Sequence, residues 1–197
     1  MGRSHIANMN YAAINAKVGG MGTRALTKKE AVSSICLYIP DKDLRNYVKA
    51  HMGSGINYYL TRWKVLARLG RANRQALRGI LGAEIDLTNI IWMYRLKRYR
   101  GIRGDSTYGY LIPIRYRLSR AATQRMAECE NTKALLEEIS KSPYARDIDF
   151  SDKKATPEQQ LISVINKRYK NAARRHPNTL VPVLAYLYGR QAQGLSI

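Results

Sequence analysis

The sequence has few of the residues that form disulfide scaffolds or metal centres. Its 197 residues include two cysteines, Cys36 and Cys129, and neither lies in a CxxC motif or at zinc-ligand spacing from a histidine. The three histidines, His5, His51 and His176, are far apart in the chain, and isolated histidines are more often surface or structural residues than catalytic ones. The sequence therefore predicts no metal site and no cofactor, and it indicates a reducing compartment.

Long apolar runs are also missing. The most apolar windows, residues 85–94 and 180–188, are about half of the ~20 residues that a membrane-spanning helix needs. The opening residues, MGRSHIANMN, contain no apolar stretch of signal-peptide length. We therefore expect neither a secreted nor a membrane-spanning protein, whereas contact with a membrane surface remains compatible with the sequence.

Signatures of catalysis are absent from the sequence as well. It contains no GxSxG, HExxH or kinase motif. The glycine-rich residues 18–22, VGGMG, lack the pattern GxxxxGK[ST] of a phosphate-binding loop and are more typical of a flexible link between helices. No catalytic residue can be nominated, and we predict that the chain is not an enzyme.

Positive charge is what the sequence has in excess. Its 34 Lys and Arg residues outnumber 14 Asp and Glu residues, so the net charge is +20, which points to an anionic partner. Residues 58–125 hold fifteen basic and three acidic residues. Four basic residues on one face of a predicted helix are candidate contacts with that partner: Lys64, Arg68, Arg71 and Arg78. Because tyrosines are interleaved with the basic residues, RNA binding is the alternative function, although no RRM, KH or zinc-finger signature accompanies them.

Helix signals recur along the whole chain, and runs with period-two alternation are scarce. A capping box at Thr27 predicts a helix that runs to about Leu37, and a similar device at Thr156 predicts one that runs to about Arg175. Asp41 follows a proline and is typical of another helix N-cap. We therefore predict an all-α protein built from helical bundle units.

The longest helical pattern covers residues 58–99. Gly82 lies in its middle, where glycine weakens a helix by ~1 kcal/mol, so we expect a bend or short break there. Gly101, Gly104 and Gly109 then mark a loop. These signals divide the chain into an N-terminal helical unit, residues 1–105, and a C-terminal helical unit, residues 106–197.

Two polar residues stand inside the most apolar part of this pattern. Asp86 and Asn89 are one helical turn apart, and a buried carboxylate without a partner costs several kcal/mol. Arg95, Lys97 or a base from another helix, such as Arg62, are the partners that we expect. A structural polar cluster that fixes how helices dock is favoured here over a ligand site.

At these residues the sequence resembles one family of rotary-ATPase subunits, the C-type subunits of archaeal and bacterial enzymes and the d-type subunits of eukaryotic V-type ATPases. Four segments carry the likeness: YAAINAKV at residues 11–18, LTKKE at 26–30, GAEIDLTNIIWMYRLKRY at 82–99 and LAYLY at 184–188. The third segment is the most specific. The family pattern there falls onto Glu84, Ile85, Asp86, Leu87, Asn89, Ile90, Arg95 and Lys97.

The resemblance implies an all-helical funnel of three similar units that is seated on the membrane-embedded proteolipid ring and receives the rotor shaft. It implies a non-catalytic adaptor of the central stalk of a V- or A-type ATPase, which serves proton or sodium transport. Such an adaptor is peripheral, lies on the cytoplasmic face of the membrane, and needs no nucleic acid as a partner.

The closing helix departs from the family pattern. Family members resemble Tyr-Leu-Tyr-x-Lys-Glu-x-Glu-Ile-x-Asn-Ile at this point, whereas residues 186–193 read YLYGRQAQ. The acidic pair and the asparagine are replaced. We therefore expect the third unit of the funnel to be missing or incomplete, with a shortened C-terminal unit.

Overall fold

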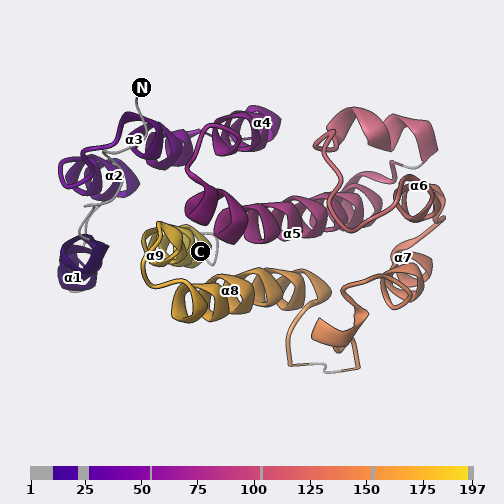
Figure 1. Cartoon of the computed structure of the whole chain (residues 1–197). Coiled ribbons are helices and arrows are strands. Elements are labelled where there is room, and N and C mark those ends of the chain that lie inside the picture. Colours follow the sequence, from indigo (N-terminus) through magenta and orange to yellow (C-terminus); the bar gives the residue numbers. More distant parts are fainter. Residues whose placement is uncertain (1–10, 22–26, 54, 103, 152–153, 195–197) are drawn as a thin grey trace. The chain divides into compact units, whose positions relative to one another are not determined.

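Every regular element that the structure describes is a helix, which confirms the predicted all-α class (Figure 1). The computed structural model describes residues 11–21, 27–53, 55–102, 104–151 and 154–194. His5, and Leu26 of the segment LTKKE, lie outside these ranges. In the described part of the chain, no helix is long and apolar enough to cross a membrane.

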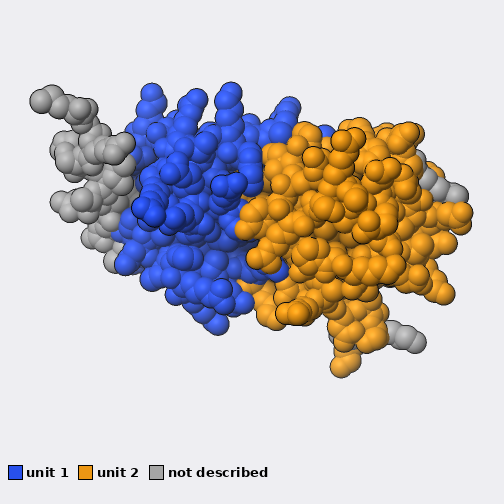
Figure 2. Space-filling model, turned by 45° about the vertical axis from the view of Figure 1, so that its right-hand side comes forward, with its two compact units in different colours: residues 1–80, 168–197 blue, residues 81–167 orange. Residues whose placement is uncertain are grey.

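The chain forms two compact units, coloured separately in Figure 2. Unit 1 comprises Met1–Ile80 with Arg168–Ile197, and unit 2 comprises Leu81–Lys167. Two long helices, α5 (Arg71–Arg95) and α8 (Pro157–Arg175), contribute residues to both.

Unit 1 is built mainly from helices of the N-terminal segment and from the last helix. The remaining elements of this unit are α1 (Tyr11–Met21), α2 (Lys28–Cys36), α3 (Lys42–Lys49), η1 (Ala50–Met52), α4 (Gly55–Leu66) and α9 (Val181–Gly194). The glycine-rich segment does not form the flexible link that the sequence indicated, because residues 18–21 belong to α1. Gly22 lies outside the described residues.

The predicted helix caps are present. The Thr27 hydroxyl accepts from the backbone N–H of Glu30 at 3.2 Å, and the Glu30 carboxylate accepts from the backbone N–H of Thr27 at 2.7 Å. Asp41 accepts from the backbone N–H of Leu44 at 2.8 Å and begins α3. Thr156 exchanges the same pair of hydrogen bonds with Gln159, and α8 ends at Arg175 as expected.

Unit 1 groups residues differently from the sequential division at residue 105. The last helix, α9, packs against α1 and α2, and its Leu184 and Leu187 are buried. Asn73 joins the same parts of the chain, because its amide donates to the Tyr11 hydroxyl and accepts from the backbone N–H of Leu180, both at 2.8 Å. These contacts bring the C-terminal segment into the unit formed by the N-terminal helices.

The long helical pattern is interrupted, but not where the sequence indicated. α4 ends at Leu66 and α5 begins at Arg71, with the Gly70 carbonyl accepting the first helical hydrogen bond, from Arg74. α5 then passes through Gly82 without a break. The predicted break at Gly82 is therefore wrong, and the packing described below gives the reason for that glycine.

Unit 2 is organised around the second half of α5, where residues 81–91 are all buried. A π-helical turn prolongs this helix to Arg100, and Gly101 ends it in the left-handed conformation at φ 63°. Among the described elements, α6 (Arg120–Glu128) packs against both η3 (Gly104–Tyr110) and α7 (Thr132–Ile139). The other elements of this unit are η2 (Leu96–Arg100) and η4 (Ala145–Asp147).

Candidate functional site

The predicted polar cluster lies in unit 2, on α5 and the π-helical turn that follows. Asp86 and Glu84 are each 1% exposed, Asn89 is 4% exposed and Lys97 is 9% exposed. Arg95 is the exposed member of the group. A buried polar group must be hydrogen-bonded to be tolerated, so the partners of these side chains show what the cluster does.

Asp86 binds an irregular segment of backbone. Its Oδ1 accepts from the backbone N–H of Tyr116 at 3.0 Å. Its Oδ2 accepts from the backbone N–H groups of Arg117 and Leu118 at 2.7 and 3.1 Å, and from the Tyr144 hydroxyl at 2.7 Å. The carboxylate therefore holds three consecutive amides that have no helical partner, together with one buried phenol.

Asp86 is bound by backbone N–H groups and a phenol, and not by the base that the sequence predicted. Arg95 instead pairs with Glu158 at the start of α8, with Nε at 2.9 Å from the carboxylate. Lys97 donates to the backbone carbonyls of Ala127 and Cys129, both at 2.7 Å. Asp86 is satisfied by backbone N–H groups because the segment at residues 116–118 lies against α5 and supplies donors that no side-chain pattern reveals.

Asn89 binds the same stretch of chain one turn further along α5. Its side-chain N–H donates to the carbonyl of Ile112 at 3.0 Å, and its Oδ1 accepts from the backbone N–H of Ile112 at 2.8 Å. The side-chain amide thereby pairs with the backbone of Ile112 as a neighbouring strand would. Together, Asp86 and Asn89 fix the irregular segment 112–118 to one face of α5.

Lys97 stabilises the end of α6. The last carbonyls of a helix have no partner inside the helix and carry partial negative charge. The Lys97 ammonium group lies between the carbonyls of Ala127 and Cys129, at the last residues of α6, and satisfies both. Three side chains of one continuous helical stretch therefore hold the segment before α6 and the end of α6 in place.

Gly82 is required by close packing rather than by flexibility. A Cβ atom built at this position would lie 2.3 Å from Cγ and 2.7 Å from Cβ of Tyr116. Tyr116 is also the residue whose backbone N–H binds Asp86. Only glycine at position 82 lets this segment approach α5 closely enough for the carboxylate to reach its amides.

Arg62, the third base that the sequence suggested for Asp86, lies in unit 1 among tyrosines. Its side chain is 0% exposed, and its two Nη atoms donate to the hydroxyls of Tyr58 and Tyr169, each at 2.9 Å. The guanidinium also lies 4.8 Å from the Tyr58 ring centroid and 5.9 Å from that of Tyr47. Hydrogen bonds and ring contacts thus accommodate this buried cation.

The four candidate contacts with an anionic partner all belong to unit 1 and are exposed. Lys64 lies in α4, Arg68 in the turn after it, and Arg71 and Arg78 two helical turns apart on α5. Residues 44–83 contain no acidic residue at all. The exposed charge of this stretch is therefore entirely positive.

The remaining reactive side chains of the described residues are cysteines and possible metal ligands. The described residues include no cluster of three or more His, Cys, Asp or Glu that could hold a metal ion. Cys36 is buried, and burial raises the pKa of its thiol. Burial likewise raises the pKa of the half-buried Cys129 thiol. High thiol pKa values make both poor nucleophiles at neutral pH.

Two features of the cluster were not predicted from the sequence: the part played by Tyr144 and the true reason for Gly82. Tyr144 is fully buried and lies 58 residues after the carboxylate that it binds. No local pattern marks either residue, because both contacts depend on how distant segments pack. Asp86, Asn89 and Lys97 bind the backbone of neighbouring segments, and the structural role favoured for the cluster stays a prediction.

Comparison with known proteins identifies a family. A family model described as ATP synthase (C/AC39) subunit matches residues 56–192, which is more than half of the chain. The matched range contains every residue of the polar cluster and all four candidate basic contacts. No curated protein and no solved structure shows significant similarity to the chain.

Proposed function

Because the chain belongs to the ATP synthase (C/AC39) subunit family of V- and A-type ATPases, we propose that it is a non-catalytic adaptor of the central stalk. In this role it joins the rotor shaft to the membrane proteolipid ring and passes rotation between them during proton or sodium transport. It acts as a peripheral protein on the cytoplasmic face of the membrane.

The observation that carries this proposal is the family match over residues 56–192. The polar cluster supports it, since a part that transmits force must keep its segments from shifting against each other. Asp86, Asn89 and Lys97 hold three places in the chain through hydrogen bonds to the backbone. Bonds to backbone atoms fix the position of a segment whatever its side chains are.

The exposed basic residues of unit 1 support the choice of partner. Charged surfaces guide association and set its specificity when the partner has the opposite sign. A stretch with exposed bases and no acids favours an acidic protein surface on the shaft or ring. We propose Lys64, Arg68, Arg71 and Arg78 as contacts with that surface.

The proposal is tested by affinity purification from detergent-solubilised membranes of the source organism, with the full chain carrying a tag. We expect shaft and ring subunits to be recovered with it, and the isolated chain to hydrolyse no ATP. Changing all four contacts to glutamate should reduce recovery of the acidic partner at least tenfold. A matched control changes four other exposed bases in the same way: Lys133, Arg146, Lys167 and Lys170.

Recovery that is equal for both fourfold variants would contradict the proposed contact surface. Recovery of neither shaft nor ring subunits by the unchanged chain would contradict the adaptor function itself. The RNA-binding alternative predicts a different result, namely recovery of RNA that falls steeply as the salt concentration rises.

A further inference from the structure

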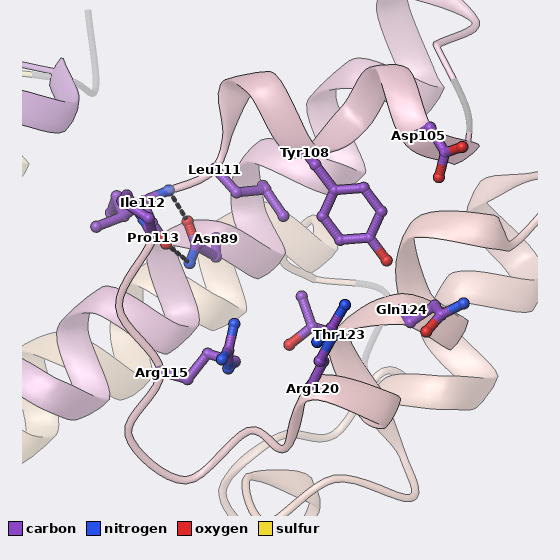
Figure 3. Close-up of a pocket in the computed structure, with 10 residues that line it drawn as sticks. All are labelled: Asn89, Asp105, Tyr108, Leu111, Ile112, Pro113, Arg115, Arg120, Thr123 and Gln124. Carbon is purple, nitrogen blue, oxygen red and sulfur yellow. Dashed lines mark hydrogen bonds between the residues drawn. The ribbon is translucent and has the colours of Figure 1, made fainter.

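Unit 2 contains a cavity of about 490 Å³ that the polar cluster adjoins (Figure 3). Asn89 reaches its wall, and the pairing of this side chain with Ile112 forms part of that wall. Leu111, Ile112 and Pro113 make the cavity apolar on this side. Ligand sites in proteins commonly have ~300 to 1,000 Å³, so the space suffices for a small molecule.

Two arginines line the cavity. In Figure 3, the side chains of Arg115 and Arg120 extend toward the space between the segment at residues 111–115 and α6. Both are exposed, and within the described residues neither forms an ion pair or a hydrogen bond through its side chain. Asp105, the acidic residue of the lining, lies on the opposite side of the cavity from Arg115 (Figure 3).

Arg120 stands at a position that is unfavourable for a cation. Arg120 is the first residue of α6, and the first turn of that helix has no acidic side chain. A helix N-terminus carries partial positive charge, so a cation there is unfavourable, and Arg115 brings a second cation to the same cavity. Residues that lower stability without improving packing or hydrogen bonding are expected mainly at functional sites.

A phenol supplies a further donor. The Tyr108 hydroxyl points into the cavity toward α6 in Figure 3. Partial burial raises the pKa of this hydroxyl, and the carboxylates of Glu128 and Asp105 raise it further against the opposing effect of Arg120. The phenol therefore keeps its proton at neutral pH and can donate a hydrogen bond to an anion.

We propose that this cavity binds a phosphate monoester, whose phosphate group pairs with Arg115 and Arg120. A dianion matches two guanidinium groups, whereas a single carboxylate would neutralise only one of them. The body of the ligand then lies against Leu111 and Pro113. The inference does not depend on the proposed role in the central stalk, and it fits either a soluble phosphorylated metabolite or the exposed phosphate of a lipid.

The test is calorimetric titration of the full chain with glycerol 3-phosphate at constant ionic strength in chloride buffer. We expect saturable binding at one site. In the double variant R115Q/R120Q, affinity should fall about 100-fold, since each charge-assisted contact contributes about tenfold. The variant K133Q/R146Q removes the same charge from exposed positions of unit 2 outside the cavity, and should bind like the unchanged chain.

A second arm separates the two sources of phosphate. Vesicles of phosphatidylcholine with phosphatidic acid present a phosphate monoester, while phosphatidylserine vesicles present negative charge without one. Preference for phosphatidic acid that R115Q/R120Q abolishes supports a lipid ligand, and binding of glycerol 3-phosphate without that preference supports a soluble one. Circular dichroism confirms that each variant is folded. The proposal is overturned if neither probe binds saturably to the unchanged chain, or if both double variants lose binding equally.

Discussion

Replacing Asp86 by alanine is the sharpest test of the polar cluster. The change removes the acceptor of four hydrogen bonds, from the amides of Tyr116, Arg117 and Leu118 and from the Tyr144 hydroxyl. The hydrogen bonds from the amides of Tyr116 and Arg117 are only partly buried, so water can replace the carboxylate there, whereas those from Leu118 and Tyr144 are buried. At about 1.5 to 2 kcal/mol for each of the two buried donors, unfolding becomes about 3 to 4 kcal/mol easier.

The cost for each donor is taken from the lower end of the range of about 1.5 to 3 kcal/mol for hydrogen bonds to charged groups, because the alanine variant no longer buries a charge. Asp86→Asn should cost less than Asp86→Ala. Its oxygen can take the position of Oδ2, which serves Arg117, Leu118 and Tyr144, and leave its NH₂ group opposite only the partly buried amide of Tyr116. We expect a loss of about 2 kcal/mol for the asparagine variant.

The assay follows the unfolding of unit 2 alone. The chain has two tryptophans, Trp63 in unit 1 and Trp92 in unit 2. In a Trp63→Phe background, the fluorescence of Trp92 during urea denaturation reports the unit that contains Asp86, and the slope of the transition shows whether it remains cooperative. Glu137→Ala, at an exposed acid on α7, is the matched control and should change the unfolding free energy by less than about 0.5 kcal/mol.

A loss of less than about 1 kcal/mol in the unfolding free energy of unit 2 for Asp86→Ala, at an unchanged slope, would contradict the role given to this carboxylate. Such a result would mean that water reaches the carboxylate and all four donors. An asparagine variant less stable than the alanine variant would contradict the assignment of the hydrogen-bonding oxygens.

Three further predictions concern the same unit. Gly82→Ala should destabilise it by about 1 to 2 kcal/mol in spite of the better helix propensity of alanine, and Tyr116→Ala in the same chain should remove most of this loss, measured by the same urea titration. Lys97→Met should cost about 2 kcal/mol by leaving two carbonyls at the end of α6 without their cation, and a change below about 0.5 kcal/mol would show that water serves them equally well. Hydrogen bonds from basic neighbours lower the pKa of Glu138 below its ordinary value of 4.5, so its stabilising contribution is present above pH 4.5 and is lost as the pH falls through the folded value. The difference in melting temperature between the unchanged chain and Glu138→Gln should therefore shrink on acidification from about pH 6, and a constant difference would contradict this pairing.

The parts of the fold that follow from neighbouring residues were predictable. The caps at Thr27, Asp41 and Thr156 each join a side chain to a backbone amide three residues later, so a short stretch of sequence contains both partners. The all-α class and several helix boundaries could therefore be predicted from the sequence.

The parts that depend on distant contacts were not predictable. Asp86 binds amides 30 to 32 residues away, and a backbone amide has the same chemistry in every residue except proline. A glycine within a helical sequence can indicate either a weak point of the helix or a place where another segment packs closely against it. For Gly82, only the position of Tyr116 decides between the two. The sequence indicates that Asp86 needs a partner, but only the packing of the chain shows which groups bind it.

The way α5 holds the segment before α6 restricts the length of that segment. Asp86 and Asn89 are separated by about one helical turn, and the backbone groups that they bind, at Ile112 and at residues 116–118, must be separated by a matching number of residues. A residue inserted between these anchors would detach one of them, although surface loops generally accept insertions. Related chains should accordingly vary in amino-acid identity here but align without gaps, and a peptide tag introduced for labelling should be placed elsewhere.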